Sequence, residues 1–379
     1  MGKGCRRCTL NFGNLIDESL VNLDRTKLLI IKLAYIGDTI SIIPVIENLK
    51  EKAPAVTLDV MVNRGSEELL EHHPGIRKVY AYDRKTAKKN LRSSLLYHAQ
   101  LFRTLRSERY STVIDFTLGD RSSFISFLSG AGSRISYENS SRLSHFLMNH
   151  FIDLDPFDYH IVDYQLQALR LFGLDSFKRN MSIHIPESID GEIDRLFSSS
   201  GISQLSLKIA IHPGARRKTR QWDPERFGVI ARRLKEEHGA GIILIGGPGE
   251  HELVDKVECQ MGSKACIKST ELSLLQMAAL LRRCSLFIGN DTAPGHIAGA
   301  VGCATLTLFG PNFPHLWRPL GPMGEVLFKN LPCCGCRHEE ELCIRPGNSC
   351  MDLITVQEVW EKVSTMLSRL HAVKGQTTT

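Results

Sequence analysis

Short apolar runs alternate with longer segments of helical spacing twice along this chain. Runs such as Lys27–Leu33 and Leu207–His212 are typical of parallel strands that are buried on both faces. The alternation predicts an α/β fold in which helices cover both sides of each sheet. Because the pattern restarts after the stretch from 186 to 205, and because 379 residues suffice for two domains, we expect two units of this kind.

Composition narrows the class of protein. Hydrophobic residues make up 42% of the chain and charged residues 23%, as in ordinary globular proteins. No apolar run approaches the roughly 20 residues that span a bilayer, and the N-terminus carries no signal-peptide core, so we expect a cytoplasmic protein. The net charge of +6 suits an anionic partner or an anionic membrane surface. No motif for nucleic-acid binding occurs, and we expect no such partner.

The stretch Ile288–His296 leads from a buried strand directly into a segment of small residues with helical spacing. Backbone N–H groups at such a helix start favour an anion. Asp291 can accept hydrogen bonds from hydroxyl groups, and His296 lies within the first turn. Taken alone, the stretch fits an ordinary capped turn in which Asp291 or Thr292 is the N-cap.

Two more polar features follow other strands of the second half. The loop from 213 to 222 carries four cations at positions 216 to 220, which suits a pyrophosphate or, equally, an ordinary cationic surface loop. Glu250 follows a Gly-rich strand end, where a carboxylate can bind ribose hydroxyls. Since the carboxyl ends of parallel strands share one edge of the sheet, the three features together predict a nucleotide-diphosphate pocket in the second domain.

Asp38 is the corresponding feature of the first domain. It follows an apolar strand at the start of a helical segment, and is either an N-cap or a carboxylate at the ligand-binding edge of the sheet. Between positions 84 and 109, eight basic residues stand against a single acid, Glu108. Such a run is usually a solvated helix face, but it can also meet an anionic acceptor or lipid head groups.

Six short motifs, in their order along the chain, resemble those of the lipopolysaccharide heptosyltransferases, glycosyltransferase family 9. The resemblance covers the chain from about residue 27 to about residue 372. The motifs are Lys32–Asp38, His212–Ala215, Arg220–Trp222, Gly246–Glu250, Asn290–His296 and Phe309–Pro311.

The resemblance implies a GT-B fold, in which two Rossmann-like domains with parallel sheets face each other across a cleft. It implies a glycosyltransferase that moves heptose from ADP-heptose to the inner core of lipopolysaccharide, inverts the anomeric carbon, and needs neither a metal nor a cofactor. The implied partners are the ADP-heptose donor and an anionic lipopolysaccharide core acceptor. The implied place is the cytoplasmic face of the inner membrane, with peripheral membrane contact.

The resemblance also implies roles for individual residues. Asp38 matches the general base, and Glu250 matches the residue that contacts adenosine. We expect Arg64 and Arg121 to contact the acceptor. The remaining donor-binding residues implied by the resemblance are Gly214, Ala215, Arg216, Arg220, Asp291, Thr292, Ala293 and His296.

The sequence departs from the family pattern at two positions. Arg220 stands where the family usually has lysine, and it suits bidentate phosphate binding better. Ala293 replaces the usual glycine, which would narrow or tilt the sugar pocket. Five cysteines between 333 and 350 fit no standard zinc spacing, and the pair Cys5 and Cys8 is only half of a zinc site, so we expect free thiols at both places.

The motifs suggest domain boundaries and leave three alternatives open. The alternatives are a relative that uses another nucleotide-sugar donor, a nucleotide-sugar epimerase of the same fold, and a non-catalytic binding or zinc-binding module. We expect the chain to comprise an N-terminal extension (1–26), an acceptor domain (27–186), a linker (187–206), a nucleotide-sugar domain (207–353), a helix that returns to the first domain (354–372) and a tail (373–379).

Overall fold

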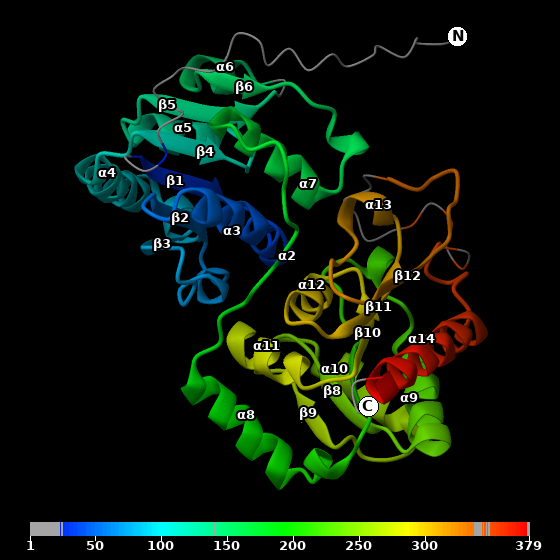
Figure 1. The fold of residues 1–379 in the computed structure, drawn as a ribbon. Helices are drawn as coiled ribbons and strands as arrows, with labels where there is room; N and C mark the ends of the chain where they lie inside the picture. The colour runs from blue at the N-terminus through cyan, green and yellow to red at the C-terminus, as the bar shows by residue number, and fades with distance from the viewer. Residues whose placement is uncertain are drawn as a thin grey trace.

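The computed structural model describes residue 23 and residues 26–138, 141–336, 343, 345, 347 and 349–376. It has two halves, each built on a parallel sheet, which run from blue to teal and from green to red in Figure 1. The expected N-terminal extension, with Cys5 and Cys8, lies outside the described residues apart from Leu23 and Thr26. Within the described part of the chain, no helix is long and apolar enough to cross a bilayer.

The first sheet has six parallel strands in the order β3-β2-β1-β4-β5-β6. This is the order of the doubly wound dinucleotide-binding fold, in which the strand order reverses between β1 and β4. The strands are β1 (Lys27–Lys32), β2 (Thr57–Asn63), β3 (Lys78–Tyr82), β4 (Thr112–Asp115), β5 (Ser133–Tyr137) and β6 (His150–Ile152).

The second sheet repeats this topology in the order β12-β11-β10-β7-β8-β9, again with all strands parallel. The strand order therefore reverses between β7 and β10. Two Rossmann-like α/β units, as expected from the sequence, are confirmed. The strands are β7 (Lys208–His212), β8 (Gly241–Ile245), β9 (Ile267–Ser269), β10 (Leu286–Asn290), β11 (Ala304–Phe309) and β12 (Gly324–Phe328).

Helices cover both faces of the first sheet because alternate residues of each strand point to opposite sides. Leu28 and Ile30 share a core with α3 and α7, whereas Leu29 and Ile31 share a core with α4 and α5. The helices and 3-10 turns are α2 (Ile36–Ile40), α3 (Ile43–Lys52), η3 (Glu67–Leu69), η4 (Thr86–Lys88), α4 (Leu91–Glu108), α5 (Asp120–Leu128), α6 (Arg142–Leu147), η5 (Pro156–Asp158), α7 (Ile161–Leu166) and η6 (Gln167–Phe172).

The second sheet is covered in the same way. Helices α9, α10 and α14 lie on one face, and α11 and α12 lie on the other. The helices and 3-10 turns are α8 (Glu187–Ser199), η7 (Ile202–Gln204), η8 (Lys218–Arg220), α9 (Pro224–His238), α10 (His251–Met261), α11 (Leu274–Arg282), α12 (Ala293–Ala300), α13 (Pro314–Trp317) and α14 (Val356–Gln376).

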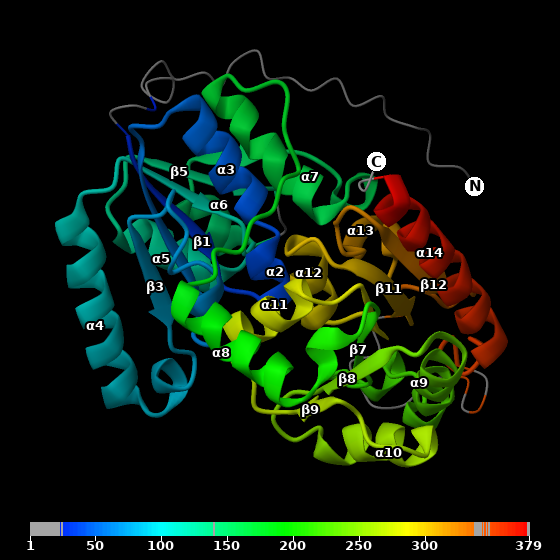
Figure 2. The ribbon, with the colours of Figure 1, turned by 60° about the horizontal axis from the view of Figure 1, so that its bottom comes forward.

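The C-terminal helix differs from the expectation that it returns to the first domain. Val359 and Val363 of α14 are buried in the core of the second half, and Arg369 pairs with Glu325 of β12 at 2.8 Å. Figure 2 shows α14 alongside β12 and α9. The apolar face of α14 is thus buried against the second half. The expectation that this helix packs on the first domain was wrong.

Two further segments differ from their expected form. The sequence predicted a single helical segment after Asp38. Instead, α2 ends and α3 begins with Pro44 in its first turn, because proline lacks the N–H that a continuous helix needs. Most of the expected linker is helix α8. Its Asp190 pairs with Arg283 at 2.9 Å, which attaches α8 to the second half beside α11.

The two halves meet through polar and apolar contacts. The carboxylate of Glu68, after β2, accepts hydrogen bonds from the hydroxyl of Ser273 and from the N–H groups of Leu274 and Leu275 at the start of α11. A carboxylate at this end of a helix is favoured by the helix dipole. Helix α2 of the first half also contacts α12 of the second. These contacts bring the carboxyl ends of the two sheets toward each other.

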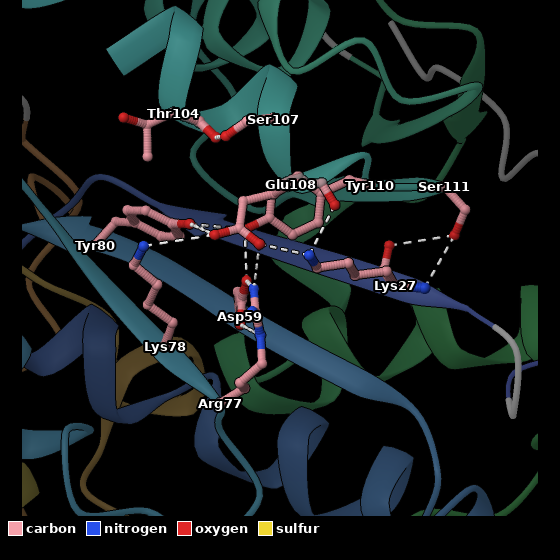
Figure 3. Close-up of polar contacts among 10 residues, drawn as sticks. All are labelled: Lys27, Asp59, Arg77, Lys78, Tyr80, Thr104, Ser107, Glu108, Tyr110 and Ser111. Carbon is pink, nitrogen blue, oxygen red and sulfur yellow. Dashed lines mark hydrogen bonds and ion pairs between the residues drawn. The ribbon is translucent and has the colours of Figure 1, made fainter. Parts of the chain in front are cut away.

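A polar network at the opposite end of the first sheet holds the C-terminal end of α4. Figure 3 shows Glu108 of α4 between Lys27, Arg77 and Lys78, and the buried Asp59 paired with Arg77. Hydrogen bonds from Lys27 and Arg77 lower the pKa of Glu108 to about 2. The one acid within the basic run is therefore already paired with cations of the sheet.

Candidate active site

A cavity of about 1090 Å³ lies between the two halves and is lined by both. It brings together ten of the twelve residues predicted from the sequence. The exceptions are Gly214 and Arg121. The ten are Asp38, Arg64, Ala215, Arg216, Arg220, Glu250, Asp291, Thr292, Ala293 and His296.

Asp38 lies at the first-half wall of this cavity, in the first turn of α2. Its Oδ1 lies 3.6 Å from Nζ of Lys32, and its Oδ2 accepts a hydrogen bond from the N–H of Tyr35 at 3.2 Å. Lys32 also donates to the carbonyl of Phe116 at 3.1 Å. The carboxylate is thus held in place by a strand residue and by the backbone, while it still faces the cavity.

Asn290, at the end of β10, fixes the cationic loop of the second half. Its side-chain oxygen accepts from the N–H of Trp222 at 3.0 Å, and its amide nitrogen donates to the carbonyls of Pro213 at 2.8 Å and Gly214 at 3.2 Å. The indole of Trp222 is buried and donates to the carbonyl of Ile354 at 2.9 Å. Both ends of the loop are therefore held against β10, which fixes where the loop emerges at the cavity.

Arg220 is the most constrained cation of this loop. Its Nη2 donates to Asn312 at 2.9 Å, and its Nη1 lies 3.4 Å from Asp291. Burial lowers the pKa of Arg220 and raises the pKa of Asp291, and the attraction between the two groups opposes both shifts. Within the described part of the chain, the buried Nε of Arg220 has no hydrogen-bond partner. Arg220 itself lines the cavity, so its positive charge can attract an anion that enters there.

Glu250 forms a second polar centre in the same cavity. Its carboxylate accepts from the N–H of Gly247 at 2.7 Å and lies 3.2 Å from Nε2 of His212. Burial alone would raise the pKa of Glu250. The hydrogen bonds from His212 and Gly247, together with the electrostatic attraction of His212, outweigh burial and lower the pKa of Glu250. A methyl group on Gly214 would lie 2.1 Å from this carboxylate, so Gly214 allows Glu250 to approach the backbone. Gly214 thus does not line the cavity, but it leaves the space that the carboxylate of Glu250 occupies.

The start of α12 completes the second-half wall. Thr292 precedes the helix but makes no side-chain hydrogen bond to it. Pro294 has no N–H, and the N–H of Gly295 donates to the carbonyl of Thr292 at 3.2 Å, so among the first three helical residues the N–H of Ala293 is the one left for a ligand. The ring of His296 packs against Gly37 of the first half. Burial lowers the pKa of His296 to about 4, so the ring is neutral near pH 7.

The two arginines expected to meet the acceptor differ in their position. Arg64 lines the cavity and pairs with Asp83 at 3.4 Å. Arg121 does not line the cavity; its guanidinium lies 5.9 Å from the ring centre of Tyr82, which does. Arg121 therefore lies beside a residue of the cavity wall and not in the wall itself.

A smaller cavity of about 260 Å³ also borders Asp38. Aromatic side chains of both halves line it, among them Tyr159, Tyr164 and Trp317. These residues were not predicted from the sequence, because single aromatic residues in short helices and loops form no recognisable pattern. The carboxylate of Asp38 is thus accessible from two directions.

Metal-binding candidates lie outside these cavities. Among the described residues, Glu47, His73 and His184 form a group close enough to hold a metal ion. However, Nε2 of His73 lies 3.2 Å from Glu47 and its Nδ1 accepts from the N–H of Gly75 at 3.0 Å, so both ring nitrogens are occupied. The thiols of Cys333, Cys334, Cys336, Cys343 and Cys350 are free, and several residues between them lie outside the described part.

The chain is similar to known proteins in sequence and in fold. The sequence profile of glycosyltransferase family 9 (heptosyltransferase) matches residues 98–344. A protein of Escherichia coli named lipopolysaccharide heptosyltransferase 3 is 27% identical over 287 residues, which cover 75% of this chain and 83% of that protein.

Two solved structures are similar in fold. The glycosyl transferase family 9 protein from Veillonella parvula DSM 2008 superposes with a TM-score of 0.78 at 24% identity, over 92% of this chain and 98% of that one. The ADP-heptose lps heptosyltransferase II of E. coli superposes with a TM-score of 0.71 at 19% identity, over 90% and 99% of the two chains.

Proposed function

The chain belongs to glycosyltransferase family 9, the heptosyltransferases, and on this premise we propose that it moves heptose from ADP-heptose to the inner core of lipopolysaccharide. The observation that carries the proposal is the cavity in which Asp38 of the first half faces the cations, carboxylates and helix start of the second half. The names of two similar proteins, a lipopolysaccharide heptosyltransferase and an ADP-heptose heptosyltransferase, support this donor and this acceptor. We place the reaction in the cytoplasm, at the inner membrane.

The second half would bind the diphosphate of the donor. Arg216 and Arg220 line this wall and would supply positive charge to the diphosphate. The N–H groups of residues 214–216 and the start of α12 would add backbone donors, which favour an anion without requiring a side-chain charge. Because Asn290 and Asn312 hold this wall in place, little reorganisation would be needed as ADP departs.

Asp38 would act as the general base. Its carboxylate would take the proton of the acceptor hydroxyl while the hydroxyl oxygen attacks the anomeric carbon of heptose. The bond from that carbon to the diphosphate would break at the same time, and attack opposite to ADP would invert the configuration. Arg220 and the backbone amides would stabilise the charge that develops on the diphosphate, so the proposed step uses no metal.

The acceptor would reach Asp38 from the side of the smaller cavity. Tyr159, Tyr164 and Trp317 can pack against the faces of a sugar ring, while Arg64 can pair with an anionic group of the core. Arg121 would act indirectly, through the ring of Tyr82. We therefore assign acceptor binding chiefly to the first half and donor binding to the second.

Replacing Gly214 with alanine should lower the affinity for ADP by about tenfold, as expected for the loss of hydrogen bonds to a charged group. The new methyl group would displace the carboxylate of Glu250 from Gly247 and His212. Calorimetry with ADP measures the change. Gly191→Ala on α8 is the matched control, since its methyl group would be 3.7 Å from the closest atom. Unchanged affinity in Gly214→Ala would remove Glu250 from the donor site.

Incubation of the protein with ADP-heptose and defined core acceptors tests the function as a whole. Mass spectrometry should detect an acceptor that is heavier by one heptose, and ADP should raise the melting temperature where UDP and GDP do not. Stabilisation by UDP or GDP would indicate another donor. Conversion of ADP-heptose into an isomer without an acceptor would indicate an epimerase. Absence of both binding and product would indicate a non-catalytic module.

A further inference from the structure

Exposed apolar side chains gather on one layer of helices in the first half. Of the nine large hydrophobic side chains that are exposed among the described residues, seven belong to α4, α5 and α6. Scattered exposed residues are normal, but a gathering of them marks an interaction site. We call this the α4–α6 surface; its members are Leu91, Leu95, Leu96, Phe124, Phe127, Leu143 and Phe146.

The three helices form a continuous layer. Helix α5 contacts both α4 and α6, and the inner side of α4 and α5 is packed on the sheet through Leu105 and Ile125. Glu108 fixes the C-terminal end of α4 to the sheet (Figure 3). Figures 1 and 2 show α4 at the outer side of the first half, away from the second half. Leu91, Leu95 and Leu96, which are 62% to 77% exposed, therefore lie on a helix whose opposite face is packed on the sheet.

Basic residues flank the exposed leucines of α4 on both sides along the chain. All eight cations between 84 and 109 are exposed, and among the described residues none of them forms an ion pair with an acid. Glu108, the acid of the same run, is paired with cations of the sheet instead. The surface thus combines bulky apolar groups with uncompensated positive charge, which is the combination that binds anionic membrane surfaces.

We propose that the α4–α6 surface docks the protein onto an anionic lipid bilayer, with the leucines of α4 in the head-group region. The choice of a bilayer as partner rests on the proposed function, since a lipopolysaccharide acceptor is carried by a membrane. Arg84 and Lys85 belong to the same basic run and also line the large cavity. The basic run beside the docking surface therefore extends to the large cavity, so docking would bring the cavity that contains Asp38 close to a lipid-borne acceptor.

Vesicle flotation tests the proposal. The native protein should float with vesicles of equimolar phosphatidylcholine and phosphatidylglycerol, and far less with phosphatidylcholine alone. The triple variant Leu91→Gln, Leu95→Gln, Leu96→Gln should lose about tenfold or more in vesicle partitioning, because its apolar contact with the bilayer is removed. The charge variant Lys88→Gln, Lys89→Gln, Arg92→Gln should lose a similar factor, and added salt should mimic it. Phe157→Gln, at a residue that is 54% exposed and lies outside the surface, is the control.

Activity measurements separate docking from catalysis. The triple variant should transfer heptose to a water-soluble core oligosaccharide at the native rate, but more slowly to an acceptor embedded in vesicles. A native protein that stays unbound with anionic vesicles, or a triple variant that binds as the native protein does, would overturn the proposal. A native dimer that becomes a monomer in the triple variant, seen by ultracentrifugation, would assign the surface to self-association instead. Vesicle binding without transfer to any acceptor would refute the proposed function and leave the docking surface standing.

Discussion

Replacing Asp38 with asparagine should lower kcat for heptose transfer by roughly 10²- to 10⁴-fold, equivalent to about 3–5 kcal/mol in the barrier. Asparagine keeps the size of the side chain and an oxygen that can accept from the N–H of Tyr35. It cannot take a proton from the acceptor hydroxyl. Because we assign the donor to the second half, the affinity for ADP should stay close to that of the native protein. Product formation by mass spectrometry and calorimetry with ADP measure the two quantities.

Two further variants make this result specific. Asp120 also lies in the first turn of a first-half helix but outside the cavity, so Asp120→Asn should leave kcat unchanged. His296 is the competing base, since it is unprotonated near pH 7 and lines the same cavity. Its pKa of about 4 makes it a weaker base than an ordinary imidazole. Near-native turnover in Asp38→Asn, together with a large loss in His296→Asn, would give the role to His296.

The central strands of both sheets could be predicted from the sequence, because strands buried on both faces are continuous apolar runs. Strands β5, β6, β9 and β12 could not. The first alternates polar and apolar residues, β6 and β9 are three residues long, and β12 lies at the edge and is only partly buried. The sequence pattern also could not predict which half α14 packs against. A helical stripe shows that a helix has an apolar face, but not which half covers that face.

The residues of the candidate site could be predicted where a polar side chain comes directly after the end of a strand. Asp38, Glu250 and Asp291 each follow a strand, and the shared edge of parallel strands brings such residues together. The supporting roles of two asparagines, Asn290 and Asn312, were not predicted. Asn290 was part of a recognised motif, and a buried polar residue at the end of an apolar strand was the available signal. Asn312 gave no signal, since its contact with Arg220 depends on how a loop folds back.

Replacing Arg220 with alanine should weaken ADP binding by about 10- to 100-fold, the range expected when a charge-assisted hydrogen bond is lost. The loss has a second component, because Asp291 would keep Asn312 as a partner but lose its cation. Burial already raises the pKa of Asp291, so removal of the guanidinium would favour the protonated acid further. Calorimetry with ADP measures the affinity, and thermal unfolding shows whether the variant is still folded.

Arg220→Lys distinguishes charge from geometry at the same position. Lysine keeps the positive charge near Asp291, but it cannot donate to Asn312, to Asp291 and to a phosphate oxygen in one plane as arginine can. We therefore expect an affinity for ADP between those of the alanine variant and the native protein. Arg232→Ala on α9, outside the cavity, is the control and should bind as the native protein does. If Arg220→Ala bound ADP as tightly as the native protein, the diphosphate would not bind at this loop. If Arg220→Lys bound ADP as weakly as Arg220→Ala, the planar guanidinium and not its charge alone would be what binds ADP.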